Sequence, residues 1–90
     1  MKLLELLGRR WVLRLLWELR EESLGFREVQ KRCGEISPTI VSRRLNELCA
    51  AAIIFRNQRG EYKLTEMGID LVKTLLPLHL WAEKWAVLRK

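Results

Sequence analysis

The residues best suited to chemistry lie close together, in the segment ISPTIVSRRLNELC at positions 36–49. Ser37 and Pro38 form a strong helix start, because a serine hydroxyl can accept from a free backbone N–H and proline loses nothing at the first helical position. Thr39 and Arg43 follow within two turns. Hydroxyl and guanidinium groups bind phosphate oxygens and the edges of bases, so the segment favours recognition of an anionic partner.

The helix predicted over residues 37–51 has two different faces when its side chains are placed at about 100° per residue. The apolar face is expected to pack inward and comprises Val41, Leu45, Leu48 and Ala52. The polar face comprises Thr39, Arg43, Asn46 and Glu47. Arg44 points more sideways, and both arginines have a simpler interpretation as a solvated charged face. Ile40 lies off the apolar face, where it either packs on the preceding helix or meets a thymine methyl group.

Residue sets typical of an enzyme are absent from the sequence. It contains no paired carboxylates in a plausible pocket, no nucleophile elbow and no phosphate-binding glycine loop. One histidine, His79, and two separated cysteines, Cys33 and Cys49, do not have the spacing of a zinc site. We expect the cysteines to fill space in the packing and His79 to be a packed or interface side chain. The sequence therefore predicts a protein that is not an enzyme and needs no metal or cofactor.

Composition restricts the class of protein further. The chain of 90 residues fits one domain, is 49% hydrophobic and carries a net charge of +6, with a pI near 9.9. A basic balance favours DNA, RNA or an acidic membrane surface as partner. No apolar run approaches the ~18–20 residues of a membrane-spanning helix. Two cysteines do not make a secreted disulfide scaffold, so we expect a reducing, cytoplasmic location and no membrane.

The expected elements place the capped helix late in a helical unit, just before a hairpin. Helices are predicted at 3–7, 10–22, 26–33, 37–51 and 65–88, and short strands at 53–57 and 61–64 are joined by a QRG turn. In the helix at 26–33, Arg27, Gln30 and Lys31 are expected to face outward. Pro77 should kink the last helix or loosen one turn.

Three helices followed by a β-hairpin wing are the elements of a winged helix-turn-helix. The expected fold class is therefore mostly α with a small β-hairpin and a long C-terminal helix, in a single domain over residues 1–90. In such a motif the second helix of the pair enters the DNA major groove with its N-terminal end first. The recognition helix would be 37–51 and the wing 53–64, and the sharp start at Ser37 would fix which side chains reach the bases.

Several motifs carry a resemblance to a known family. LLGRRW at 6–11, FREV at 26–29, ISPTIVSRRLNEL at 36–48 and YKLTEMG at 62–68 resemble the corresponding segments of HxlR-type winged-helix transcriptional regulators, within the MarR-like superfamily. The resemblance covers almost the whole chain. It implies a homodimeric regulator that binds double-stranded DNA sequence-specifically, at an inverted repeat. Ala52 departs from the pattern, because the family usually has a glycine there to close the recognition helix. Some members sense electrophiles through a cysteine ahead of the first helix; this sequence starts after that position, so we do not expect redox sensing of this kind.

The resemblance also implies which residues contact DNA. By position it points to Ser37, Thr39, Ile40, Ser42 and Arg43 in or beside the major groove, and we expect Pro38 and Arg44, on the same helix, to contact DNA as well. Basic residues on the preceding helix and the wing are expected to contact the DNA backbone, namely Arg27, Lys31, Arg56, Arg59 and Lys63.

Dimerisation is expected through the first and last helices. Apolar residues repeat along the last helix at 4-3-4-3 spacing, and neighbouring positions widen the apolar face beyond what one side of a small core needs. The expected interface residues are Leu3, Leu4, Leu7, Leu71, Leu75, Leu78, Trp81 and Trp85. The alternative is a monomer in which the last helix is buried on both sides.

Two other functions remain open at this stage. Some winged helices dock onto proteins, but an acidic or apolar recognition face would favour that role and this one is basic. An architectural DNA binder with little sequence preference would differ from a regulator in its specificity ratio.

Overall fold

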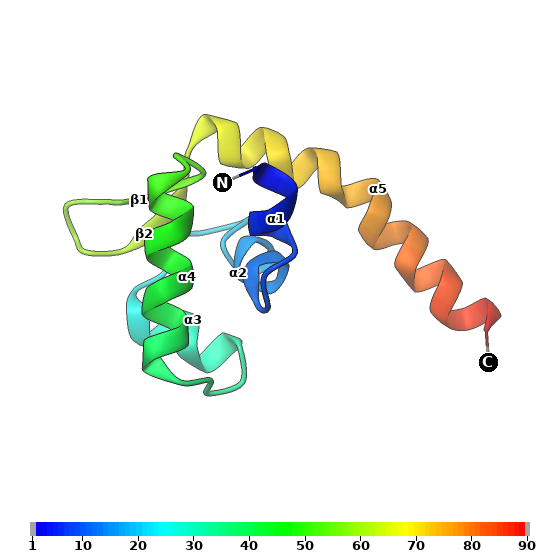
Figure 1. Ribbon diagram of the computed structural model, residues 1–90, viewed down its shortest axis with the longest axis horizontal. Helices are drawn as coiled ribbons and strands as arrows, with labels where there is room; N and C mark the ends of the chain where they lie inside the picture. Colours follow the sequence, from blue (N-terminus) through cyan, green and yellow to red (C-terminus); the bar gives the residue numbers. More distant parts are fainter. Residues whose placement is uncertain (1, 90) are drawn as a thin grey trace.

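The computed structural model describes residues 2–89. In chain order its elements are α1 (Leu3–Leu7), α2 (Val12–Glu18), α3 (Phe26–Arg32), α4 (Pro38–Ala50), β1 (Ile54–Arg56), β2 (Tyr62–Leu64) and α5 (Glu66–Leu88). Helices α1–α4 and the hairpin gather into one body, and α5 crosses its top before projecting away from it (Figure 1). The predicted fold class, a winged helix-turn-helix with a long C-terminal helix, is confirmed.

Helix α4 begins and ends with local signals that the sequence displays. The Ser37 hydroxyl accepts from the backbone N–H of Thr39 at 3.2 Å, and Pro38 occupies the first turn. At the other end Ala52 adopts a left-handed conformation, with φ at 61°, and Ile53 N donates to Leu48 O at 3.1 Å. This bond returns the chain toward the hairpin as in a glycine-terminated helix. Ala52 is exposed and does not extend the buried apolar face, contrary to the prediction.

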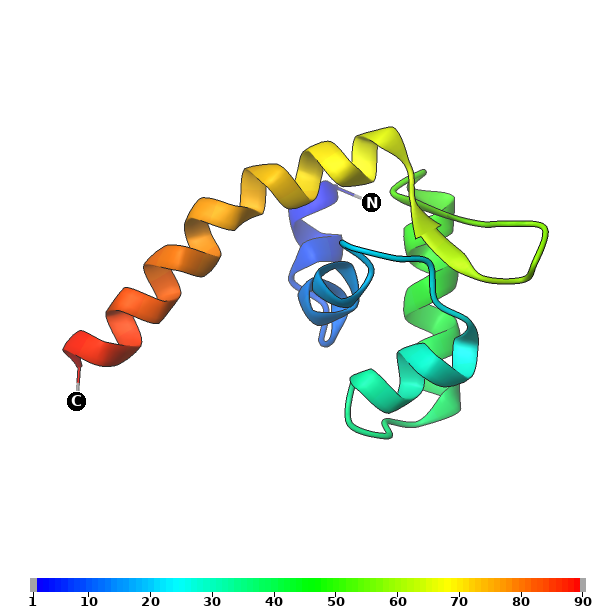
Figure 2. The same cartoon turned by 180° about the vertical axis from the view of Figure 1, so that it is seen from behind.

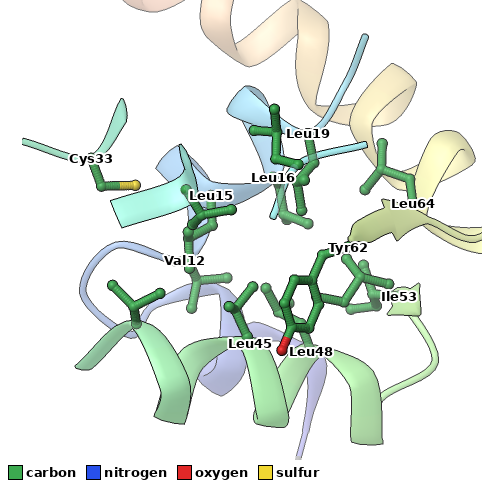
Figure 3. Close-up of a cluster of buried hydrophobic side chains, with 14 of the residues drawn as sticks. Val12, Leu15, Leu16, Leu19, Cys33, Leu45, Leu48, Ile53, Tyr62 and Leu64 are labelled. Carbon is green, nitrogen blue, oxygen red and sulfur yellow. The ribbon is translucent and has the colours of Figure 1, made fainter. Parts of the chain in front are cut away.

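A cluster of buried side chains holds α4 against the rest of the body (Figure 3). Helix α4 contributes Val41, Leu45 and Leu48, which are fully inaccessible to solvent. They pack in the same cluster as α2, α3 and the hairpin, whose buried residues include Val12, Leu15, Leu16, Leu19, Val29, Cys33, Ile53, Ile54, Tyr62 and Leu64. Burying a large aliphatic side chain contributes about 1.5–3 kcal/mol. One face of α4 is therefore fixed inward, and the opposite face must point to solvent.

The hairpin has a short, well-bonded turn. Ile54 pairs with Leu64 and Arg56 with Tyr62, and Gly60 takes a positive φ of 79°. Asn57 Oδ1 accepts from the backbone N–H groups of Arg59 and Glu61, both at 2.9 Å. The sequence did not predict a third partner, but Leu24 forms a bridge to Tyr62 through two backbone hydrogen bonds of 3.0 and 2.7 Å.

Two details of the earlier helices differ from expectation. Helix α2 spans Val12–Glu18 and not 10–22. Trp11 turns left-handed, with φ at 79°, so the helix starts after it, and the helix ends at Glu18 with Leu19 as its C-cap. Gln30 was expected to face outward, yet it is buried, and its Nε2 donates to Ile36 O at 2.9 Å. The amide of Gln30 thus holds the loop that leads into α4.

Helix α5 is continuous through Pro77 and bends in its middle, where its colour passes from yellow to orange (Figures 1 and 2). Its first half packs on the body: Leu71, Val72 and Leu75 lie against the core. His79 stacks on Trp17 of α2, with ring centroids 4.2 Å apart, and its Nε2 lies 2.7 Å from Glu83 Oε1. Every residue from 80 to 89 is exposed. Among the described helices none is both long and apolar enough to cross a bilayer.

Candidate nucleic-acid interface

The outward face of α4 carries a row of exposed polar side chains. Thr39, Ser42, Arg43 and Asn46 follow one another at spacings of three, one and three residues, so they occupy successive turns of the same face. Together with Pro38 and Phe26 they line a shallow, open depression. Among the ion pairs formed by residues 2–89 none involves Arg43. Its guanidinium can therefore bind an external acceptor without first breaking an internal pair.

The N-terminal end of α4 is exposed together with this row. Ser37 and Pro38 are both accessible, and the helix behind them is 13 residues long. Free backbone N–H groups and the positive end of the helix dipole make such a terminus suitable for a phosphate. Ile40 is half-buried, so part of its side chain remains available for a methyl contact.

Arg44 does not belong to this face, contrary to expectation. Its side chain is buried, with 9% of the residue exposed. Its Nε donates to Arg10 O at 3.0 Å and one terminal nitrogen donates to Glu47 Oε1 at 2.8 Å. Both bonds point back into the protein, so the geometry does not support the predicted base contact. Arg44 is an internal side chain of the winged helix.

Helix α3, whose first residue Phe26 lines the depression, also carries basic side chains. Arg27 and Lys31 are both exposed, as expected. Arg27 also donates to Gln30 Oε1 at 3.0 Å, and Gln30 in turn holds Ile36 O. This chain of bonds ties α3 to the loop that precedes α4, so the two helices of the pair keep a fixed relation.

The wing presents its basic residues in two different ways. Arg59 at the tip and Lys63 on β2 are exposed. Arg56 is also exposed, but its Nε donates to Gly60 O at 3.3 Å and its guanidinium lies 5.7 Å from the Tyr62 ring centroid. Arg56 thus braces its own hairpin, whereas Arg59 and Lys63 extend toward solvent. Phe55, paired with Lys63 in register, is 42% exposed.

Sequence reasoning did not include Asn46, Phe26 and Phe55 among the site residues. Asn46 was placed on the polar face by its periodicity, and that signal would have sufficed, since an asparagine amide can bind adenine through two hydrogen bonds. No comparable signal exists for Phe26 and Phe55. Phe26 is half-buried against the core and Phe55 is exposed, and an apolar residue type does not reveal that either ring reaches this surface.

The two cysteines lie in or against the hydrophobic core. Burial raises the pKa of the Cys33 thiol, and burial also raises the pKa of Cys49 despite the opposing charge of Arg56 nearby. Both thiols therefore stay protonated at neutral pH. Within residues 2–89, no three His, Cys, Asp or Glu side chains gather closely enough to hold a metal ion.

Comparisons with known proteins agree with this geometry. Residues 6–89 match the family model described as HxlR-like helix-turn-helix. The uncharacterised HTH-type transcriptional regulator YvaP of Bacillus subtilis is 30% identical over 90 residues, which cover 93% of this chain and 83% of YvaP. A possible HxlR family transcriptional factor from Thermoplasma volcanium superposes with a TM-score of 0.85 at 26% identity, covering 100% of this chain and 84% of that one. Quinone-bound YodB from B. subtilis gives 0.81 at 30% identity, covering 89% and 90%.

Proposed function

Because the chain belongs to the HxlR-like helix-turn-helix family and is a DNA-binding transcriptional regulator, we propose that it binds an inverted repeat of double-stranded DNA as a homodimer. In this proposal each protomer inserts the outward face of α4 into the major groove of one half-site. The chain would act in the cytoplasm, without a catalytic step and without a cofactor.

One observation carries the DNA-binding geometry: the exposed row on α4 lies opposite its fully buried face. A helix held in this way can enter the major groove without unpacking. Arg43 is suited to the O6 and N7 acceptors of guanine, and Asn46 to adenine. Thr39 and Ser42 can contact bases or nearby phosphates, while the helix start at Ser37 faces a phosphate. These residue assignments are the core of the proposal.

Contacts to the DNA backbone would come from the residues around this helix. Arg27 and Lys31 are exposed on α3, and Arg59 and Lys63 are exposed on the wing. Such contacts position the protein and carry no sequence information. Arg56 contributes less in this scheme, because its guanidinium is already bonded to the wing. Together these charges should make binding strongly dependent on salt.

The dimer proposal rests on apolar surface that the described residues leave uncovered. Exposed fractions are 55% for Leu78, 56% for Trp81 and 48% for Trp85 on α5, and 47% and 79% for Leu3 and Leu4 on α1. The first of these adjoins a groove of about 590 Å³ between α2 and α5. Large apolar side chains left exposed in such numbers on α1 and α5 favour an interaction site.

Three of the residues first expected in the interface fit the dimer less well. Leu7, Leu71 and Leu75 are only partly exposed, and they pack against the core of the same protomer. The proposed interface is therefore the later half of α5 together with the exposed leucines of α1. An isologous contact between two copies would repeat this patch about a two-fold axis, which matches an inverted repeat.

Selection of bound DNA from a random pool tests the proposal as a whole. It should return an inverted repeat with half-sites roughly one helical turn, about 34 Å, apart. Arg43→Ala should then weaken binding to the selected site by about 1–3 kcal/mol and relax preference at one position. Arg20→Ala is the matched control. It removes an exposed arginine that is not part of the proposed DNA-contacting face and whose guanidinium stacks on the Trp17 ring at 3.8 Å. Equal loss of affinity on selected and random DNA would instead make Arg43 a phosphate contact.

The dimer has its own test. Leu78→Glu places a charge in the exposed stripe and should produce monomers that retain their helix content. Their affinity for the inverted repeat should fall steeply, because the two half-sites no longer bind as one unit. Lys73→Glu, at an exposed polar position of the same helix, is the control. Sedimentation at micromolar concentration decides the matter: a wild-type protein that runs as a monomer with and without DNA refutes the dimer.

A further inference from the structure

A cluster of charges, in which Arg9 is 41% exposed but Arg44 and Glu47 are largely buried, joins the recognition helix to the turn between α1 and α2. Glu47 of α4 is shared by two arginines: its Oε1 lies 2.8 Å from a terminal nitrogen of Arg44, and its Oε2 lies 3.2 Å from Arg9 Nε. The side chains of Arg44 and Glu47 are only 11% and 20% exposed. Pairs shielded from water to this degree are screened much less than surface pairs. The Arg9–Glu47–Arg44 cluster therefore links α4 to the α1–α2 turn, and we call this link the joint.

Arg44 also bonds to backbone that has an unusual conformation. Its Nε donates to Arg10 O at 3.0 Å, and the next residue, Trp11, has a φ of 79°. A bulky aromatic residue in the left-handed region is strained and persists only where its surroundings hold it. Trp11 packs against the core from one side, and Arg44 holds the preceding carbonyl from the other. The start of α2 is thus tied directly to the middle of α4.

The buried apolar cluster already holds α4 against α2, and Leu6 of α1 belongs to the same cluster. A hollow of about 490 Å³ lies between α1 and the C-terminal end of α4, lined by Lys2, Leu3, Leu6, Glu47, Ala50 and Ala51. Interlocking side chains resist rotation between helices, whereas a hollow permits it. In this region the charged contacts add to the apolar packing in holding α4 relative to the α1–α2 turn.

We infer that Arg44 is a positioning residue for DNA binding, which acts through Glu47 and Arg10 to set the orientation of the recognition helix relative to α1. This inference rests on the proposed dimer, in which α1 belongs to the interface and α4 reads the DNA. With the joint intact, both recognition helices of a dimer stand at one separation and one angle. With the joint broken, each helix keeps its base-reading side chains but loses its fixed relation to the other half-site.

The experiment measures the ratio of affinities for different half-site spacings. A smaller folded fraction lowers all these affinities by the same factor, so it leaves the ratio unchanged. Dissociation constants are determined for the selected inverted repeat and for copies with one or two base pairs added to or removed from its centre. Wild-type protein should prefer one spacing clearly. Arg44→Ala should lose about tenfold in affinity at that spacing, and the ratio between the best and neighbouring spacings should fall toward one.

Control variants separate positioning from recognition and from folding. Arg43→Ala should weaken all spacings by the same factor and keep the ratio, because it alters the base contact only. Arg44→Lys retains a charge for Glu47 and should restore part of the ratio. Glu47→Gln keeps the side-chain shape without the charge and should lower the ratio. If circular dichroism shows Arg44→Ala to be unfolded, these last two variants carry the test.

The outcomes distinguish the inference from the proposed function. Folded Arg44 and Glu47 variants with the spacing ratio of wild type would overturn the positioning role and leave the dimer intact. A wild-type protein without any spacing preference would refute the dimer itself, and the inference with it. A reduced ratio in the Arg44 and Glu47 variants, beside an unchanged ratio in Arg43→Ala, would establish the joint.

Discussion

Replacing Gly68 by alanine would test how α5 is joined to the DNA-binding body. The added Cβ would lie 2.1 Å from Ile53 O and 3.2 Å from the Leu64 side chain. The first contact is to backbone that cannot turn aside. Ile53 O already accepts from Thr65 N at 3.0 Å, and Thr65 Oγ1 accepts from Gly68 N at 3.0 Å. The same residues, Ile53, Thr65 and Gly68, therefore form both the N-terminal cap of α5 and its contact with the hairpin.

The magnitude follows from the distances. Moving the new Cβ from 2.1 Å to an ordinary contact of 3.4 Å separates α5 from Ile53 by 1.3 Å. Overpacking of this kind costs about 1–3 kcal/mol, and each strained hydrogen bond adds about 0.5–1.5 kcal/mol. Alanine recovers about 1 kcal/mol of helix propensity over glycine. The unfolding free energy should therefore fall by roughly 3 kcal/mol, which corresponds to about 12–24 °C in Tm for a domain of this size.

Urea and thermal unfolding followed by circular dichroism measure this change. Gly25→Ala is the matched control, because Gly25 has a φ of −76° and a Cβ there would meet nothing within 4 Å. It should cost less than about 1 kcal/mol, the typical effect at a helix start. All proteins are compared at one concentration, since dimerisation would couple stability to concentration. A Gly68→Ala protein within about 0.5 kcal/mol of wild type would refute the reasoning, because that is the range of ordinary surface substitutions.

Two further substitutions probe the end of the recognition helix and the wing. Ala52→Gly should raise the unfolding free energy by about 0.5–1 kcal/mol, because Ala52 is exposed with a φ of 61° and glycine adopts that conformation without strain; equal or lower stability in urea would contradict this. Arg59→Ala should weaken binding to all sequences alike and lower the slope of log affinity against log salt by roughly one unit, and a changed DNA motif with an unchanged slope would argue against a phosphate contact.

The order of elements could be predicted because its signals are local. Ser37 and Pro38 predict the start of α4, Thr65 predicts the start of α5, and Gly60 predicts the hairpin turn. The departures arise where distant segments meet. Leu24 pairs with Tyr62 across 38 positions, and the left-handed Trp11, which packs against the core, makes α2 start later than predicted. Neither contact is associated with a motif in the residues next to it, so local sequence patterns could not predict it.

On α4, too, some side-chain positions follow from local periodicity and others depend on tertiary contacts. Periodicity correctly separated the buried Val41 and Leu45 from the exposed Arg43. It could not settle Arg44, which lies about 100° further around the helix, between the two faces. The side chain is drawn inward by Arg10 O, which lies 34 positions away in the sequence. Two adjacent arginines in one helix thus have different environments, and only tertiary structure distinguishes them.

Helix α5 explains why the expected interface was too long. Its apolar stripe continues along 23 residues, so its periodicity gives Leu71 and Leu78 the same character. The body of the domain reaches only the first part of the helix, and the remainder extends beyond it (Figure 2). Leu71 is therefore covered by its own protomer, whereas Leu78 is 55% exposed. The same apolar pattern therefore includes residues that pack in their own protomer and residues that stay exposed. The position at which the helix leaves the core depends on the size of the core, and no residue in the stripe indicates it.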